Sequence, residues 1–131
     1  MKNKYLADTM AIVLFLEKRK LPVKVKALFL KAEKGEIEIL ISAISLAEIA
    51  YLSEKKRIDT NLASATHFFS IYSSFQIVEL SEGDISAAFL IDDIPELHDR
   101  LIAGTAHKMQ IPIITNDPKI ITSIHTKTIW E

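Results

Sequence analysis

The chain alternates between short apolar runs and longer segments in which apolar and polar residues are mixed. The run EIEILIS at 36–42 alternates and then becomes apolar, as a buried strand does. The short runs predict β-strands over residues 4–8, 36–42, 76–80, 111–115 and 126–130. The longer segments predict helices over residues 9–19, 23–34, 44–57, 59–75, 81–94 and 96–110, and a short helical piece over 118–124.

Strands that alternate with helices in this way are typical of a parallel sheet covered by helices on both faces. We therefore expect an α/β fold with about five short strands in a mainly parallel sheet. Residues 1–131 are most simply one domain, long enough to bury a substantial core. Gly35 is expected to end the second helix, Asp59 or Thr60 to cap the helix over 59–75, and Ser81 to cap the next one.

Composition narrows the class of protein. Apolar residues make up 49% of the chain, which is normal for a packed fold, and no apolar run approaches the ~18 residues of a membrane span. The chain has no cysteine, which excludes disulfides and thiol catalysis. The net charge of −1 argues against a protein that coats nucleic acid by general electrostatics. Without a recognisable signal peptide, we expect a cytoplasmic protein that has no membrane association.

Two predicted strands end in a carboxylate, Asp8 in KYLADT and Asp117 in PIITNDP. Two more acids, Glu48 and Asp99, are expected in the first turns of the helices over 44–57 and 96–110. In an open parallel sheet the ligand crevice lies outside the carboxyl ends of the strands, so these acids could converge there. Converging carboxylates repel one another unless a divalent cation neutralises them, and hard cations such as Mg²⁺ and Mn²⁺ take oxygen ligands.

Each of these acids also has a purely structural interpretation. Asp8 and Asp117 could cap the helices that follow them, and Asp99 could complement a helix dipole. Ser45-Leu46-Ala47-Glu48 fits a capping box, in which the Glu48 carboxylate would accept from the Ser45 backbone N–H. A carboxylate used in that way could not easily bind a metal as well.

The four acids, in their order and spacing, resemble those of the PIN domain, and most of all the VapC-type toxins of prokaryotic toxin–antitoxin pairs. The segments that carry the resemblance are LADTMAIVLFL, ISLAEIAYL, LHDRLIAGTA and IITNDPKI, and the similarity extends to the terminal TKTIW. One departure is Met10, where relatives usually carry a serine. The resemblance implies a single PIN-like domain of three layers.

The resemblance also implies a metal-dependent endoribonuclease, the toxin of a type II toxin–antitoxin system. Its ligands for Mg²⁺ or Mn²⁺ would be Asp8, Glu48, Asp99 and Asp117, supported by Thr115 and Asn116. RNA is the implied substrate, and a cognate antitoxin and a second copy of the chain are the implied partners. The alternative is a non-catalytic PIN-like module that binds RNA or protein. A phosphoacceptor receiver domain is disfavoured, because Lys2-Asn3-Lys4 stands where receivers carry an acidic pair. We leave His98 outside the site.

Overall fold

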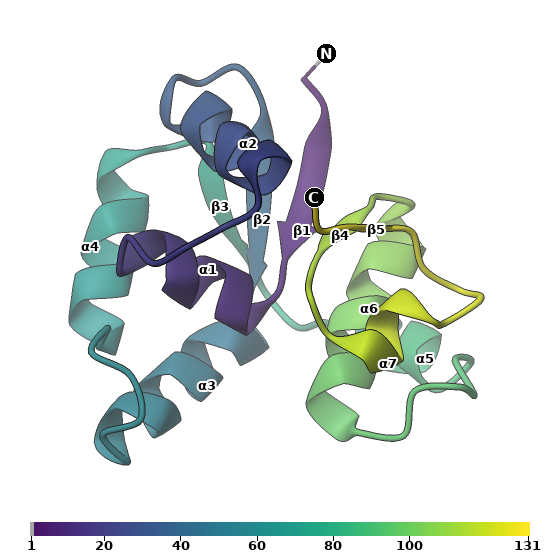
Figure 1. Ribbon diagram of the computed structural model, residues 1–131. Helices are drawn as coiled ribbons and strands as arrows, with labels where there is room; N and C mark the ends of the chain where they lie inside the picture. The colour runs from purple at the N-terminus through teal and green to yellow at the C-terminus, as the bar shows by residue number, and fades with distance from the viewer. Residues whose placement is uncertain (1) are drawn as a thin grey trace.

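The computed structural model describes residues 2–131, and its centre is a five-stranded sheet (Figure 1). The strand order is β3-β2-β1-β4-β5, and every pairing is parallel. The strands are β1 (Lys4–Ala7), β2 (Glu38–Ser42), β3 (Phe75–Val78), β4 (Ile113–Ile114) and β5 (Thr128–Ile129). The predicted α/β fold is confirmed, with a sheet that is wholly rather than mainly parallel.

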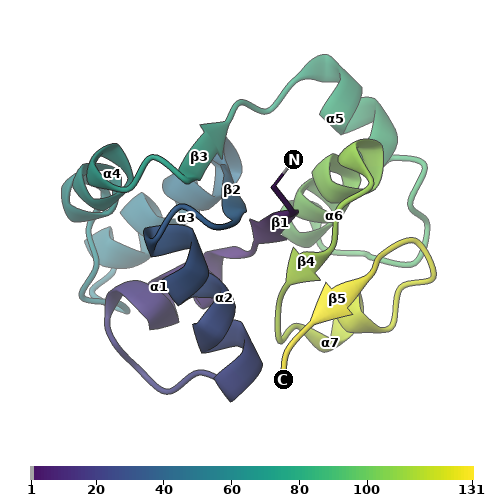
Figure 2. The same cartoon turned by 90° about the horizontal axis from the view of Figure 1, so that it is seen from above.

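Helices cover both faces of this sheet, as Figure 2 shows from above. The helices on one face are α1 (Thr9–Leu16), α2 (Val23–Glu33), α3 (Ala43–Glu54) and α4 (Leu62–Ile71). The other face carries α5 (Glu82–Ala88), α6 (Leu97–Met109) and α7 (Pro118–Ile121). The result is the predicted arrangement of three layers.

Alternation of side chains along the strands creates a core on each side of the sheet. Ala7 and Ile114 face the helices α1 to α4, whereas their neighbours Leu6 and Ile113 face α6 and α7. All four side chains are fully buried. Since successive strand residues point to opposite faces, the apolar runs noted in the sequence supply both cores at once.

Helix α4 begins later than the sequence predicts. Asn61, and not Asp59 or Thr60, is its N-cap, with a side chain that accepts from Ser64 N. The backbone N–H groups of Asp59 and Thr60 instead donate to Glu17 Oε2 at 3.0 and 2.9 Å. This long-range contact holds both residues outside the helix, and the Asp59 or Thr60 cap is therefore wrong.

Helix α5 ends at Ala88, although the pattern predicted a helix as far as residue 94. The Ser81 cap is confirmed, because its hydroxyl accepts from Asp84 N. Beyond Ala88 the chain leaves the helix, and Ile91 and Ile94 are buried in the core between the sheet and α6. The expected end of α2 is also confirmed, since Gly35 follows its C-cap with φ of +78°.

Close packing of α5 against α6 explains the glycine of the LIAGTA segment. A Cβ added at Gly104 would lie 2.6 Å from the backbone N and Cα atoms of Ala88. The two helices can approach this closely only because residue 104 has no side chain. None of the helices described for residues 2–131 is both long and apolar enough to cross a membrane.

Candidate metal centre

Asp8 and Asp117 follow the neighbouring parallel strands β1 and β4, in which Ala7 pairs with Ile114. The carboxyl ends of the two strands therefore lie at the same edge of the sheet. Thr115 connects the two acids: its hydroxyl donates to Asp8 Oδ2 and accepts from Asp117 N at 3.0 Å. Thr115 therefore satisfies the turn backbone and also binds a candidate ligand carboxylate.

Both strand-end acids also cap helices. Asp8 Oδ1 accepts from Ala11 N at 2.9 Å in α1, and Asp117 Oδ1 accepts from Lys119 N at 2.9 Å in α7. The structural interpretation of these two acids is therefore correct, and it is compatible with a place in the cavity. A carboxylate has about four lone-pair sites, and a cap uses only one of them.

Glu48 lies in the second turn of α3 rather than the first, because this helix begins at Ala43. Ser42 is the N-cap, with its hydroxyl accepting from Ile44 N at 3.2 Å, so Ser45 is already inside the helix. The capping box between Ser45 and Glu48 does not form. Glu48 Oε1 instead accepts from Thr9 Oγ1 at 2.5 Å, which brings α1 and α3 together at the carboxylate.

Asp99 lies in the first turn of α6, as predicted, but it is not the cap of that helix. The cap is Glu96, whose two carboxylate oxygens accept from His98 N and Asp99 N at 3.0 and 2.8 Å. With the cap supplied by Glu96, the half-buried Asp99 carboxylate faces the strand-end acids. It borders the same cavity as Asp8 and Asp117.

This cavity has a volume of about 440 Å³ and lies at the carboxyl edge of the sheet. All four predicted acids line it, together with Asn116, Met10 and Trp130. The structure therefore brings together side chains from four separate elements. Because their only ligand atoms are oxygens, the acids fit a hard divalent cation such as Mg²⁺ or Mn²⁺.

Two of the four acids resist ionisation, chiefly because they are buried and further because other acids lie near them. Burial raises the pKa of Asp8 to about 6 against the hydrogen bonds from Thr115 and Ala11, with further repulsion from Asp117 and Glu48. Burial also raises the pKa of Asp99 to about 7, and repulsion from Asp117 adds to this effect. A group of acids that resists ionisation in this way is stabilised in its ionised form by a cation.

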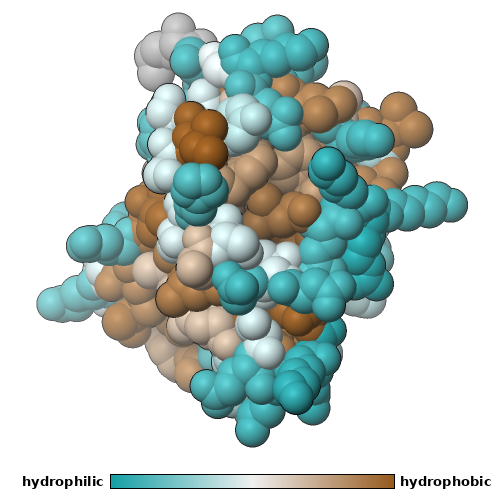
Figure 3. All heavy atoms as spheres, turned by 90° about the vertical axis from the view of Figure 1, so that its left-hand side faces the viewer, coloured by the Kyte–Doolittle hydropathy of each residue, from teal (hydrophilic) through white to brown (hydrophobic). Residues whose placement is uncertain are grey.

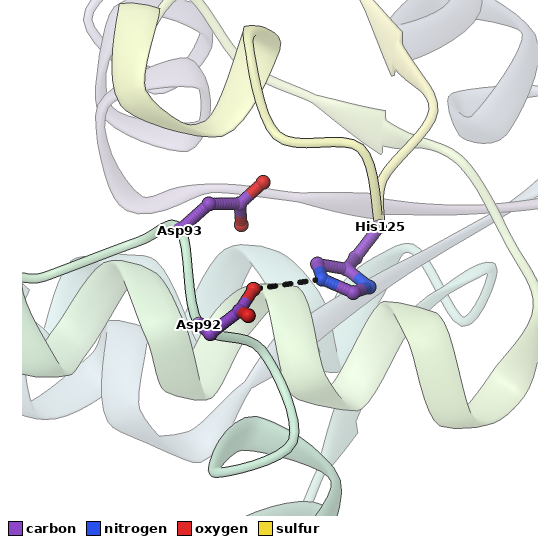
Figure 4. A group of neighbouring side chains, drawn as sticks. All are labelled: Asp92, Asp93 and His125. Atoms are coloured by element: carbon purple, nitrogen blue, oxygen red, sulfur yellow. Dashed lines mark hydrogen bonds and ion pairs between the residues drawn. The ribbon is translucent and has the colours of Figure 1, made fainter.

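A second group of side chains lies elsewhere (Figure 4). Within residues 2–131, only Asp92, Asp93 and His125 bring three acid or histidine ligand atoms within 4.8 Å of one another. Among the described residues, no three of the acids in the main cavity meet this limit. Asp93 accepts from Ser123 Oγ and Ile124 N at 2.8 and 2.9 Å, and Asp92 Oδ1 lies 3.3 Å from His125 Nε2. These contacts hold the segment before α6 against the segment after α7. This structural role explains why Asp92, Asp93 and His125 lie together.

Sequence reasoning missed Thr9, Ser45 and Trp130 near the site. Trp130 lines the cavity, and Thr9 contacts both Ser45 and Glu48. The one local signal for Thr9 is its place beside Asp8 at the end of β1. His98 lies beside the cavity, with Nδ1 3.7 Å from Glu48 Oε2 and 3.1 Å from Glu96 Oε1.

Comparisons with known proteins agree with this architecture. The chain superposes on VapBC2 from Rickettsia felis, bound to a promoter DNA fragment, with a TM-score of 0.73 and 24% identity over 98% of this chain and 99% of that chain. DNA-bound VapBC from Salmonella typhimurium gives a TM-score of 0.71 and 21% identity, over 97% of each chain. A toxin–antitoxin complex from Klebsiella pneumoniae gives a TM-score of 0.65 and 16% identity, over 95% of each chain.

These structural likenesses show a shared fold. No curated protein sequence matches the chain. A family model described as the PIN domain matches residues 5–122, a span that includes all four acids of the cavity. The chain therefore belongs to the PIN domain family.

Proposed function

We propose that the protein is a Mg²⁺- or Mn²⁺-dependent endoribonuclease that hydrolyses RNA phosphodiester bonds, and that it is the toxin of a type II toxin–antitoxin pair. The observation that carries the proposal is the convergence of Asp8, Glu48, Asp99 and Asp117 on one cavity. Membership of the PIN domain family supports it. The raised pKa values of Asp8 and Asp99, caused chiefly by burial and added to by neighbouring acids, support a site that a bound cation would stabilise.

The four acids would hold one or two divalent cations. When bound, such a cation polarises the scissile phosphate, acidifies a water molecule and offsets the charge that develops on the leaving oxygen. The side chains around the acids keep them in place, as Thr115 does for Asp8. The exposed Asn116 lines the cavity, where its amide can donate to a phosphate oxygen or accept from a water molecule.

We propose that the RNA strand passes along α3. Glu48 and Tyr51 lie on α3, and Lys55 is its C-cap; the spacing of three and four residues places all three along one side of the helix. The Tyr51 side chain is exposed, and Lys55 Nζ lies 5.5 Å from the centre of its ring. Aromatic rings stack with bases, and lysines neutralise phosphates. A hollow of about 430 Å³ at this face is lined by Ala47, Glu48, Tyr51, Leu52 and His98.

An antitoxin partner, a homodimer and a cytoplasmic location complete the proposal. The structure from Klebsiella pneumoniae that resembles this chain is a toxin–antitoxin complex, which supports a protein partner. Leu62, Ile71 and Ile77 on α4 and β3 are exposed and offer apolar contact area for a partner. Figure 3 views the side on which α4 lies and shows hydrophobic patches there among hydrophilic side chains.

Cleavage of a mixed RNA pool tests the proposed activity. We expect products when the protein is incubated with Mn²⁺, and none when a chelator is present or when Asp99 is replaced by Asn. Each reaction is compared at equal folded fraction, so that lost activity is not confused with lost structure. A protein that binds the pool but cleaves it in neither Mg²⁺ nor Mn²⁺ would instead be the non-catalytic module.

A further inference from the structure

Two buried hydroxyl groups beside the cavity have no part in helix capping. Thr9 is 6% exposed and Ser45 is fully buried. Their helices are capped by other residues, since Asp8 caps α1 and Ser42 caps α3. Thr9 Oγ1 lies 3.0 Å from Ser45 Oγ and 2.5 Å from Glu48 Oε1. The three side chains thus form a short hydrogen-bonded chain that ends on a candidate metal ligand.

The number of available protons decides which group donates in each of these hydrogen bonds. A carboxylate that binds a cation is deprotonated and can only accept hydrogen bonds. The single hydroxyl proton of Thr9 must therefore be donated to Glu48. The contact between Thr9 and Ser45 then requires the Ser45 hydroxyl to donate to the Thr9 oxygen. Ser45 consequently donates to Thr9, and Thr9 donates to Glu48.

We propose that Thr9 is a positioning residue that holds the Glu48 carboxylate in its ligand orientation, and that Ser45 fixes the rotamer of Thr9. The proposal rests on the cavity being the metal centre proposed above. Glu48 is the longest of the four acid side chains, and a hydrogen bond to one oxygen restricts its rotation. Glu48 Oε2 accepts no hydroxyl proton, and His98 Nδ1 lies 3.7 Å from it, beyond hydrogen-bond distance, so this oxygen remains available for the cation. Thr115 holds Asp8 in a corresponding way.

The test compares Mn²⁺ binding to the whole chain, measured by titration calorimetry without RNA. Thr9→Val keeps the shape of the side chain but removes its hydroxyl, whereas Thr9→Ser retains the hydroxyl. Loss of a group that orients a ligand typically weakens metal binding by about 10- to 100-fold. We expect Thr9→Val to weaken Mn²⁺ binding by about tenfold, Thr9→Ser to stay within about twofold of the parent, and Ser45→Ala to fall between them.

Thr105→Val is the matched control. Thr105 is 2% exposed, and its hydroxyl donates to Leu101 O within α6, so this variant removes a buried hydroxyl that contacts none of the four acids. We expect it to bind Mn²⁺ as tightly as the parent does. The proposal is overturned if Thr9→Val binds like the parent, if Thr9→Ser binds as weakly as Thr9→Val, or if Thr105→Val weakens binding as much as Thr9→Val.

A second measurement, made without metal, separates this proposal from the proposed function. Urea unfolding of Thr9→Val, Glu48→Ala and the double variant gives the coupling between the two side chains. We expect the effect of Thr9→Val on the unfolding constant to change by about twofold or more once Glu48 is absent. Additive effects would overturn the proposal. A parent protein that shows coupling but does not bind Mn²⁺ would refute the metal centre, and with it the role of Thr9 in metal binding.

Discussion

Thr115 and Asp8 are separated by 107 positions in the chain, yet their side chains share a buried hydrogen bond. The contact exists because β1 and β4 are neighbours in the sheet, with Ala7 beside Ile114. It fixes one oxygen of Asp8, and the N–H of Ala11 fixes the other. The orientation of the most buried candidate ligand is therefore set by the strand order.

Asp8→Asn and Asp99→Asn are expected to abolish RNA cleavage while the protein remains folded. An asparagine at position 8 can still cap α1, because Asn and Asp are equally good N-caps. Both variants remove charge from a repelling group of acids, so their stability in metal-free buffer is expected to equal or exceed that of the parent. They are also expected to lose the Mn²⁺-dependent rise in melting temperature. Asp59→Asn, at an exposed position, is the control. If Asp8→Asn or Asp99→Asn cleaves RNA at the rate of the parent, the replaced acid is not a metal ligand.

Glu48→Gln is expected to be folded and inactive, since an amide keeps the hydrogen-bonding capacity but provides no charge for a cation. Ser42→Ala removes the actual cap of α3 and is expected to lower the free energy of unfolding by about 0.5–2 kcal/mol without loss of cleavage. Chemical denaturation and Mn²⁺-dependent cleavage, compared at equal folded fraction, distinguish the two effects. Active Glu48→Gln protein would count against all four acids acting together.

In the metal-free protein, the contribution of Asp8 and Asp99 to the free energy of unfolding is expected to fall as pH rises from about 4 to about 7. The pKa values of Asp8 and Asp99 are raised from 3.8 to about 6 and about 7 by folding. Their contribution is therefore fully present below the unfolded pKa and is lost as pH rises through the folded values.

This pH-dependent contribution can be isolated by comparing urea unfolding of the parent and Asp8→Asn at several pH values. The stability of the variant relative to the parent is expected to increase between pH 4 and pH 7, because the variant has no proton to lose at position 8. Carboxylates with lowered pKa, such as Asp84 and Asp93, contribute with the opposite sign and cancel in this difference. A difference that does not vary with pH would show that the pKa of Asp8 is not raised.

Tyr51→Ala is expected to weaken RNA binding without affecting Mn²⁺ binding. Loss of one stacked base costs about 1–3 kcal/mol, which corresponds to a rise in KM of roughly 5- to 150-fold. Tyr51→Phe keeps the ring and is expected to stay close to the parent. Steady-state cleavage of a short RNA gives KM and kcat separately. An unchanged KM in Tyr51→Ala would show that the strand does not follow α3.

Gly104→Ala is expected to destabilise the fold by about 1–3 kcal/mol, as overpacking of a core commonly does. The added methyl group would have to displace the backbone of Ala88. Equilibrium unfolding in urea measures the effect. An equally stable variant would mean that α5 can move away from α6 without loss.

The fold was predictable because its strong signals are local. The apolar runs and the helices between them indicate the layers, and Asp8 and Asp117 at strand ends indicate the edge that carries the cavity. The boundaries were less predictable where distant residues decide them. Glu17 holds Asp59 and Thr60 outside α4, and neither contact can be inferred from local sequence. Thr9 was missed for the same reason, because its partners lie on another helix.

The strand order divides the four acids between two parts of the molecule. Residues 2–78 contain Asp8 and Glu48 together with β1, β2 and β3, whereas residues 82–131 contain Asp99 and Asp117 together with β4 and β5. The two parts meet in the sheet along the pairing of Leu6 with Ile113 and Ala7 with Ile114. A protein cut between β3 and α5 would thus yield two fragments with half of the cavity each. Neither fragment alone could provide the proposed activity. Recovery of RNA cleavage after the two fragments are mixed would show that β1 and β4 had paired.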